Sequence, residues 1–209
     1  MDTKPRQKSF VKNPINGTKF TIAISSAKGG VGKSTFAINF ALAFFLLNTA
    51  DWVALNQFGL LYIFDDLPLY ISVFIGILML DLIGAYLPHF LEHKIKPLWM
   101  IHLVHHTDHK VDTTTGNRHH PLESIIRFTF TLFGAFIIGA NIGIVMLYQS
   151  LSVFSTQFTH ANISLPKKID YYLSFIIVSP DMHKIHHHYK LPYTCLLYTS
   201  PSPRDGLLS

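Results

Sequence analysis

Three long apolar stretches dominate the chain and predict helices within a membrane. Residues 34–64 contain one charged residue, Asp51, and residues 69–87 are interrupted only by Asp81. A third stretch, residues 128–159, has no formal charge. A helix needs about 20 apolar residues to span the hydrocarbon core of a bilayer, and each stretch is long enough to supply them. The pattern therefore predicts an all-α, multi-pass membrane helical bundle.

The beginning of the chain has a different pattern, typical of a soluble α/β domain. Residues 18–25 (TKFTIAIS) suit a buried strand, residues 27–34 are rich in glycine, and residues 35–43 favour a helix. We therefore divide the chain into a short N-terminal β-loop-α fragment, residues 1–43, and a membrane domain, residues 44–194. Residues 195–209 lack periodicity, and we expect them to be an unrelated tail of artefactual origin.

Composition agrees with a membrane location and narrows the possible chemistry. Apolar residues make up 49% of the chain and charged residues 14%, a balance unusual for a soluble domain. The single cysteine, Cys195, excludes an internal disulfide and a cysteine-ligated zinc or iron–sulfur site. The basic N-terminal segment has no aromatic-interleaved groove or helix-turn-helix pattern, so we expect no nucleic-acid partner.

Charge and chain direction together predict a topology. Basic residues follow the second apolar stretch and an acidic turn precedes it, so the positive-inside rule places the following segment in the cytoplasm. If the third stretch crossed the membrane once, the last histidines would lie opposite the others. Two full crossings need about 40 residues, more than residues 128–159 provide. We therefore expect a shallow or tilted helical hairpin turning near residues 139–143, and we expect Asp81 to face the protein interior or a polar cavity. The basic residues are Lys94, Lys96, Lys110, Arg118 and Arg127.

Histidines carry the strongest chemical signal. All thirteen lie between His89 and His188, and eight form three clusters with the patterns H-x3-H, H-x2-H-H and H-x2-H-H. Residues three or four apart share one face of a helix, so each cluster can direct two or three imidazoles at one point. Neutral imidazole is a common ligand of transition metals, and eight exceed the needs of one four-coordinate zinc ion. The count favours two metal ions and redox chemistry. The clusters are His89 and His93; His102, His105 and His106; and His183, His186 and His187.

These clusters and their flanking motifs resemble the fatty acid hydroxylase/sterol desaturase superfamily of membrane di-iron enzymes. Residues 97–99 (PLW) precede the second cluster, residues 117–123 (NRHHPLE) resemble the N-R-x-H-P-x-E segment, and residues 160–162 (HAN) resemble the H-x-N element. Ser179-Pro180 precedes the last cluster as the family's T/S-P does. The resemblance covers about residues 44–194.

The resemblance implies O2-dependent hydroxylation or desaturation of a membrane lipid, fatty acyl or sterol-like. It also implies two iron ions and electrons from a reductase or from a cytochrome or ferredoxin. Its H-x-N element adds a ninth ligand, so the expected set is His89, His93, His102, His105, His106, His160, His183, His186 and His187. Four further residues are expected to hold the ligand rings in orientation: His120, Glu123, Asp108 and Asp181.

Two features depart from the family pattern. Phe90 stands where the family often has arginine after the first histidine. The family also continues past the last cluster with D-x-N-Y-G-like and W-D-x-x-F-G-like segments, in place of which this chain has its tail. We therefore expect little or no activity from this chain as it stands. The alternatives from the histidines alone are a non-redox metal site, such as zinc, in a non-catalytic membrane protein, and solvated surface histidines.

The glycine-rich segment has a chemistry of its own. Residues 28–35 (KGGVGKST) resemble the deviant Walker A loop of the ParA/MinD/Mrp class of ATPases, in which backbone N–H groups and lysine bind phosphate. The later strands of such a domain, with their Mg2+-positioning aspartates, have no counterpart before the apolar stretches begin. We expect an ATPase fragment fused to the membrane domain, with ATP and Mg2+ binding that is weak or absent. The alternative function is an ATPase of the iron–sulfur carrier or partitioning type. Its nucleotide-binding residues would be Lys28, Gly29, Gly30, Gly32, Lys33, Ser34 and Thr35.

Overall fold

The computed structural model describes residues 33–64, 66–108 and 110–187, with the side chains of residues 33–36 excepted. All regular secondary structure in these ranges is helical, as the apolar pattern predicts. The strand and most of the phosphate loop expected before Lys33 lie outside the described residues. The helices are α1 Lys33–Leu55, α2 Leu60–Ile63, α3 Leu69–Asp81, η1 Leu82–Tyr86, α4 Leu87–Lys94, α5 Lys96–His106, η2 Thr115–Asn117, α6 Pro121–Ile138, α7 Ile142–Thr159, α8 Lys167–Leu173 and α9 Pro180–His186.

Three segments are long and apolar enough to cross a membrane: Ala37–Ile63, Leu69–Lys94 and Pro121–Ile138. The second joins α3 to α4 through the π-helical turn η1, so one continuous helix carries the chain towards the first histidine cluster. Large apolar side chains point outward along these segments, among them Phe44, Leu69 and Phe74. An outward apolar surface is stable in lipid and costly in water, so the chain is a membrane protein.

Helix α1 starts at Lys33 and runs unbroken to Leu55. It therefore includes the helix expected after the phosphate loop and most of the first apolar stretch, and it passes through the boundary predicted after residue 43. Ala50 of α1 is fully buried, and α1 packs against α6 and α7.

Helices α6 and α7 form the expected hairpin. Gly139 ends α6 in the left-handed conformation (φ 80°), and the Asn141 side chain accepts a hydrogen bond from the Ile144 N–H at the start of α7. The hairpin is deeper than predicted, because α6 begins at Pro121, before the uncharged run. Each helix has 18 residues, about 27 Å, close to the thickness of the hydrocarbon core.

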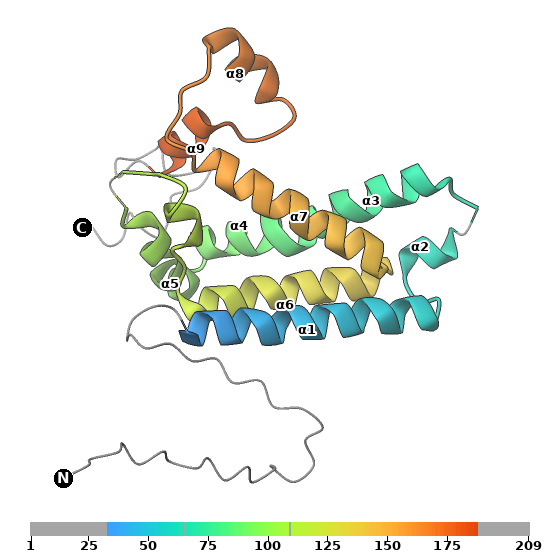
Figure 1. The fold of residues 1–209 in the computed structure, drawn as a ribbon. Helices are drawn as coiled ribbons and strands as arrows, with labels where there is room; N and C mark the ends of the chain where they lie inside the picture. Colours follow the sequence, from blue (N-terminus) through green and yellow to red (C-terminus); the bar gives the residue numbers. More distant parts are fainter. Residues whose placement is uncertain (1–32, 65, 109, 188–209) are drawn as a thin grey trace, which may run out of the picture.

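The long helices α1, α3–α4, α6 and α7 lie alongside one another, as Figure 1 shows, and the chain reverses direction from each to the next. Small side chains such as Ala50 and Ala135 let α1 and α6 approach closely. Figure 1 also shows α5 and α9 together at one end of this bundle, while α2 lies at the opposite end and α8 stands away from the long helices. The buried core consists of Leu46, Ala50, Leu80, Ala135, Ile138, Ala140, Ile144, Val145 and Tyr148.

The prediction for Asp81 was wrong, because its side chain is exposed. The buried positions on this helix are Gly76, Leu80 and Gly84, which follow one another at intervals of four residues and define the packed face. Asp81 is one position beyond Leu80, about 100° away around the helix, and therefore lies off that face.

The two glycines of the hairpin should differ sharply in their tolerance of a side chain. A Cβ at Gly139 would lie 2.6 Å from the Phe58 carbonyl oxygen. The substituted residue would also have to adopt a positive φ, which side chains disfavour. At Gly143, in α7, the nearest atom is the Asn141 Oδ1, at 3.4 Å. We expect Gly139→Ala to destabilise the protein by about 1–2 kcal/mol from backbone strain alone, before the clash is added. Thermal unfolding in detergent should show a lower midpoint for Gly139→Ala and an unchanged or higher one for the control Gly143→Ala; equal midpoints would contradict the hairpin geometry.

Candidate metal centre

The histidine clusters lie on four elements that meet at one end of the bundle. The first cluster is on α4, the second is at the end of α5, His160 follows the last residue of α7, and the third is on α9. Local sequence places the ends of these helices. Pro97 lies in the first turn of α5, and the Ser179 side chain caps α9 by accepting a hydrogen bond from the Met182 N–H. Clusters that are far apart in the sequence thus face one another across the end of the bundle.

Eight histidines form two groups of four, and within each group the nitrogen atoms available as ligands all lie within 4.8 Å of one another. In the second group, the His160 Nε2 is 2.9 Å from the His183 Nε2 and 3.2 Å from the His105 Nε2. The first group is His89, His93, His102 and His186; the second is His105, His160, His183 and His187.

The ninth histidine, His106, lies between the two groups. Its Nε2 is 3.2 Å from the His102 Nε2 of the first group. Its ring centroid is 4.8 Å from that of His186 in the first group and 4.4 Å from that of His187 in the second. The structure therefore brings all nine histidines of the expected set into one region.

Burial keeps these imidazoles neutral. It lowers the pKa values of His106, His183 and His186 well below the ordinary value, and neighbouring histidines lower them further. Burial likewise lowers the pKa of His187 to about 3. A neutral imidazole has a free lone pair on one ring nitrogen, which a metal ligand requires.

Several buried ring nitrogens have no hydrogen-bond partner among the described residues. His93 and His186 lack a partner at both nitrogens, and His105, His106 and His187 lack one at Nδ1. Buried polar atoms in folded proteins are almost always paired, and unpaired ones are costly. Bound metal ions would satisfy such nitrogens, so the donor set fits metal binding.

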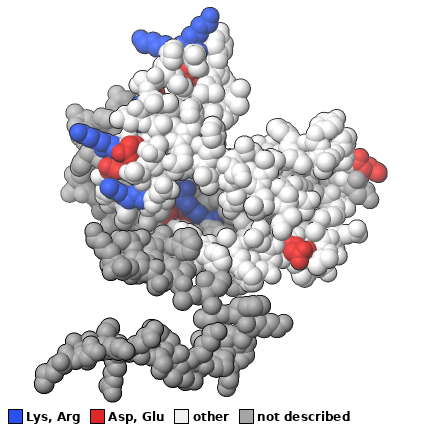
Figure 2. Space-filling model, in the orientation of Figure 1, with Lys and Arg blue, Asp and Glu red and all other residues white. Residues whose placement is uncertain are grey.

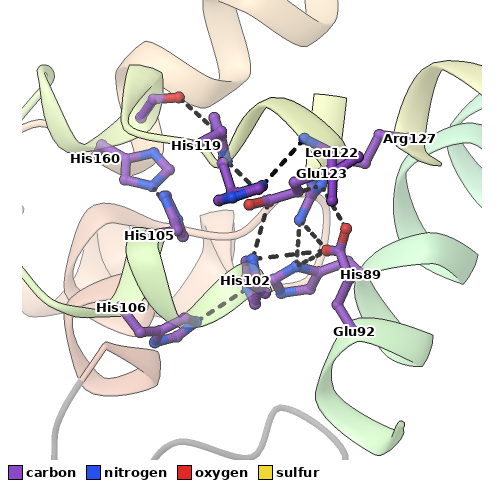
Figure 3. A network of polar contacts seen from close by, with 12 residues as sticks. His89, Glu92, His102, His105, His106, His119, Leu122, Glu123, Arg127 and His160 are labelled. Carbon is purple, nitrogen blue, oxygen red and sulfur yellow. Dashed lines mark hydrogen bonds and ion pairs between the residues drawn. The ribbon is translucent and has the colours of Figure 1, made fainter. Parts of the chain in front are cut away.

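A layer of charged residues lies behind the first group (Figure 3). The Glu123 Oε1 is 2.9 Å from the His102 Nδ1 and 2.8 Å from the His119 Nδ1. An ionised carboxylate only accepts hydrogen bonds, so the Nδ1 of His102 carries the proton and its Nε2 is left with the lone pair that faces the other histidines. Glu92 and Arg127 complete this layer through an ion pair in which the Glu92 side chain is buried and that of Arg127 is partly exposed.

The four residues expected to orient the ligands have different positions. Glu123 contacts His102 as expected. Asp108 accepts a hydrogen bond from the Thr115 hydroxyl in the loop after α5, and Asp181 accepts hydrogen bonds from Ser164 and Leu165 before α8. His120 caps α6, where its Nδ1 accepts a hydrogen bond from the Leu122 N–H, and its neighbour His119 contacts Glu123 instead.

Sequence analysis missed three members of the charged layer: Glu92, His119 and Arg127. Helical spacing was the available signal. Glu92 stands three residues after His89, and Arg127 stands four residues after Glu123, so each shares a helix face with a residue already singled out. Arg127 is one of the basic residues on which the topology prediction rests, and in the structure it is paired with Glu92, which is almost completely buried.

The lowered histidine pKa values predict acid sensitivity of the metal-free protein. These groups are neutral when folded and take up protons near pH 6.5 when unfolded, so the stability they contribute is complete above pH 6.5. This stability decreases as the pH falls towards the pKa of each histidine in the folded protein, which is about 3 for His187. Each such group should lower the free energy of unfolding by about 1.4 kcal/mol per pH unit below 6.5. Denaturant unfolding in detergent between pH 7 and 5 measures this slope, and His187→Gln should reduce it; stability independent of pH would contradict the buried, neutral cluster.

Comparison with known proteins gives one short match and one long one. A segment of 37 residues is 62% identical to the iron-sulfur cluster transfer protein NUBPL of Dictyostelium discoideum, which corresponds to 18% of this chain and 12% of that protein. The chain thus spans about an eighth of the length of this curated relative. No solved structure matches the chain. A model of the fatty acid hydroxylase family matches residues 73–200, which is more than half of the chain and contains all nine clustered histidines together with residues 195–200 of the predicted tail. The chain therefore belongs to the fatty acid hydroxylase family.

Proposed function

We propose that this protein is a membrane-bound di-iron oxygenase that hydroxylates or desaturates a lipid. The observation that carries the proposal is the pair of four-histidine groups, with His106 between them. One four-coordinate zinc ion would use four of these imidazoles and leave the others buried without a partner. Two metal ions use the whole set.

The chain's own residues hold and shield the proposed iron site. The nine proposed ligands are His89, His93, His102, His105, His106, His160, His183, His186 and His187. Iron supplies the ability to activate O2 and to change oxidation state, which non-redox ions lack. Glu123 holds His102 in the tautomer that directs a lone pair at the site. Trp99 is fully buried against the rings of His93 and His106, and such apolar packing excludes water from reactive chemistry.

A lipid substrate suits the position of this site. The histidines lie where membrane-spanning segments end, so an acyl or sterol-like chain can approach from the bilayer while its polar end stays at the surface. Electrons would come from a reductase or from a cytochrome or ferredoxin.

The distribution of charge favours the cytoplasmic side for the histidine end. On the face shown in Figure 2, lysine and arginine side chains gather over the histidine end and over α8, while the opposite end shows only acidic ones. From the positive-inside rule we propose that the histidines lie on the cytoplasmic side.

Metal analysis tests the proposal directly. The protein purified in detergent and loaded with ferrous iron should hold about two iron ions, and His186→Ala and His183→Ala should each remove about one of them, because each variant damages one group. His120→Asn is the matched control, since asparagine can also cap α6, and it should keep both ions.

Lipid-dependent O2 consumption should be measured in the same preparations and in a version whose residues 195–209 are replaced by a family-like closing segment. Consumption should require both histidine groups and should rise in the second version. Preferential binding of zinc, with no O2 consumption in either version, would favour a non-catalytic metal protein instead.

The short match favours a second candidate for the N-terminal fragment. The name of the relative states iron–sulfur cluster transfer, which agrees with the iron–sulfur carrier alternative suggested by the phosphate loop. We propose that the loop residues Lys28, Gly29, Gly30, Gly32, Lys33, Ser34 and Thr35 belong to an incomplete nucleotide site. Among the described residues, the helix that begins at Lys33 continues directly into the membrane bundle.

Calorimetric titration with MgATP distinguishes an incomplete site from a working one. We expect weak or undetectable binding, because the residues that would complete Mg2+ coordination are missing from the sequence. Tight binding that Lys33→Ala abolishes would establish the ATPase alternative.

A further inference from the structure

Arg127 occupies a central position in the charged layer behind the first histidine group. It lies on α6, one turn after Glu123, and its side chain is 28% exposed. Its guanidinium binds Glu92 of α4 through two nitrogens, with the Nε 3.2 Å from Oε1 and the Nη2 in contact with Oε2. The Nε is also 3.1 Å from the Glu123 Oε1, and the Nη2 lies 2.9 Å from the His89 Nδ1. Figure 3 shows these contacts converging on one side chain.

The carboxylates need a cation at this position. The side chains of Glu92 and Glu123 are only 1% and 0% exposed. A buried carboxylate that loses its partner destabilises the fold strongly. Together with His102 these carboxylates form an acidic cluster that itself has the composition of a metal site. Arg127 already fills this cluster with a planar, permanently charged group that can bind two carboxylates at once.

The contacts of Arg127 reach two of the four histidines in the first group, His89 directly and His102 through Glu123, and they hold the residue next to a third, His93. Glu92 lies between His89 and His93 on the same turn of α4, and Glu123 holds His102 of α5. Arg127 therefore joins the two helices that carry these ligands to α6. It has no hydrogen bond or ion pair with the second group among the residues that the structure describes.

We propose that Arg127 is a positioning residue for the first metal: by clamping Glu92 to Glu123, it holds His89, His93 and His102 in the arrangement that binds the ion. This proposal rests on the proposed two-metal function and deepens it. Arg127 does not touch the metal. Its loss should release the first group selectively, whereas a general loss of folding would weaken both groups.

Cobalt binding to the full chain in detergent tests the proposal, because Co2+ reports coordination through its visible spectrum. The wild-type protein should bind two ions. Arg127→Gln should lower the affinity for the ion at the first group by about 10- to 100-fold, the range typical for loss of a residue that orients a metal ligand. The affinity for the ion at the second group should not change. Arg127→Lys keeps the charge but not the bidentate geometry, so it should lower the affinity at the first group to a smaller extent. The control Arg118→Gln removes a half-exposed arginine that pairs with Asp108 and should bind two ions normally.

Double variants identify which ion is affected. Arg127→Gln combined with His93→Ala should still bind one ion tightly, whereas Arg127→Gln combined with His183→Ala should bind none tightly. If Arg127→Gln fails to fold, as judged by circular dichroism, the cobalt affinity of Arg127→Lys at the first group tests the role of Arg127.

The role of Arg127 would be overturned if the folded Arg127 variants kept wild-type affinity at both sites, or if both sites were weakened equally. Either result would leave the two-metal function intact. A wild-type protein that binds fewer than two ions would overturn both.

Discussion

The convergence of nine neutral imidazoles in one buried volume is the constraint on which the rest of the structure depends. Imidazoles from α5, α9 and the ends of α7 and α9 approach to 2.9–3.2 Å between Nε2 atoms, a separation that charged rings would not tolerate. Burial keeps the rings neutral, and within the described part of the chain several of their nitrogens have no hydrogen-bond partner. The first and last clusters are almost a hundred residues apart, so the chain between them has to leave this end of the bundle and return to it.

The hairpin of α6 and α7 provides that return. Because the two helices have equal length, the residue after α7 comes back to the level at which α6 begins, and His160 meets His105. The reversal depends on Gly139, which adopts a positive φ and packs against the backbone of Phe58. A turn far from the histidines thus determines whether the second histidine group can form.

The carboxylate layer links the membrane bundle to the histidine end. Arg127 and Glu123 lie in the same helix that spans towards Gly139, while Glu92 lies on the helix that carries the first cluster. Ion pairs in a water-poor region are strong when fully paired and costly when broken, so this layer makes the relative position of α4 and α6 well defined. Family membership and the two histidine groups together favour iron-dependent lipid oxidation over nucleotide chemistry as the function of this part of the chain.

The sequence by itself determined the helices, the hairpin and the eight histidines of the three clusters, because hydrophobic runs and three- and four-residue spacings are local properties that survive in any helical fold. The ninth histidine, His160, was indicated only by the resemblance to the family's H-x-N element. The sequence also identified Glu123 as a partner of the ligands. Only the tertiary structure decided which histidines share a group, since His186 joins His89 and His93 while its neighbour His187 joins His105. Only the tertiary structure also showed that Asp81 lies on the exposed face of its helix and that Arg127 belongs to the charged layer behind the first histidine group. Those outcomes depend on how helices rotate and pack against one another, which pairs residues that spacing along the chain does not relate.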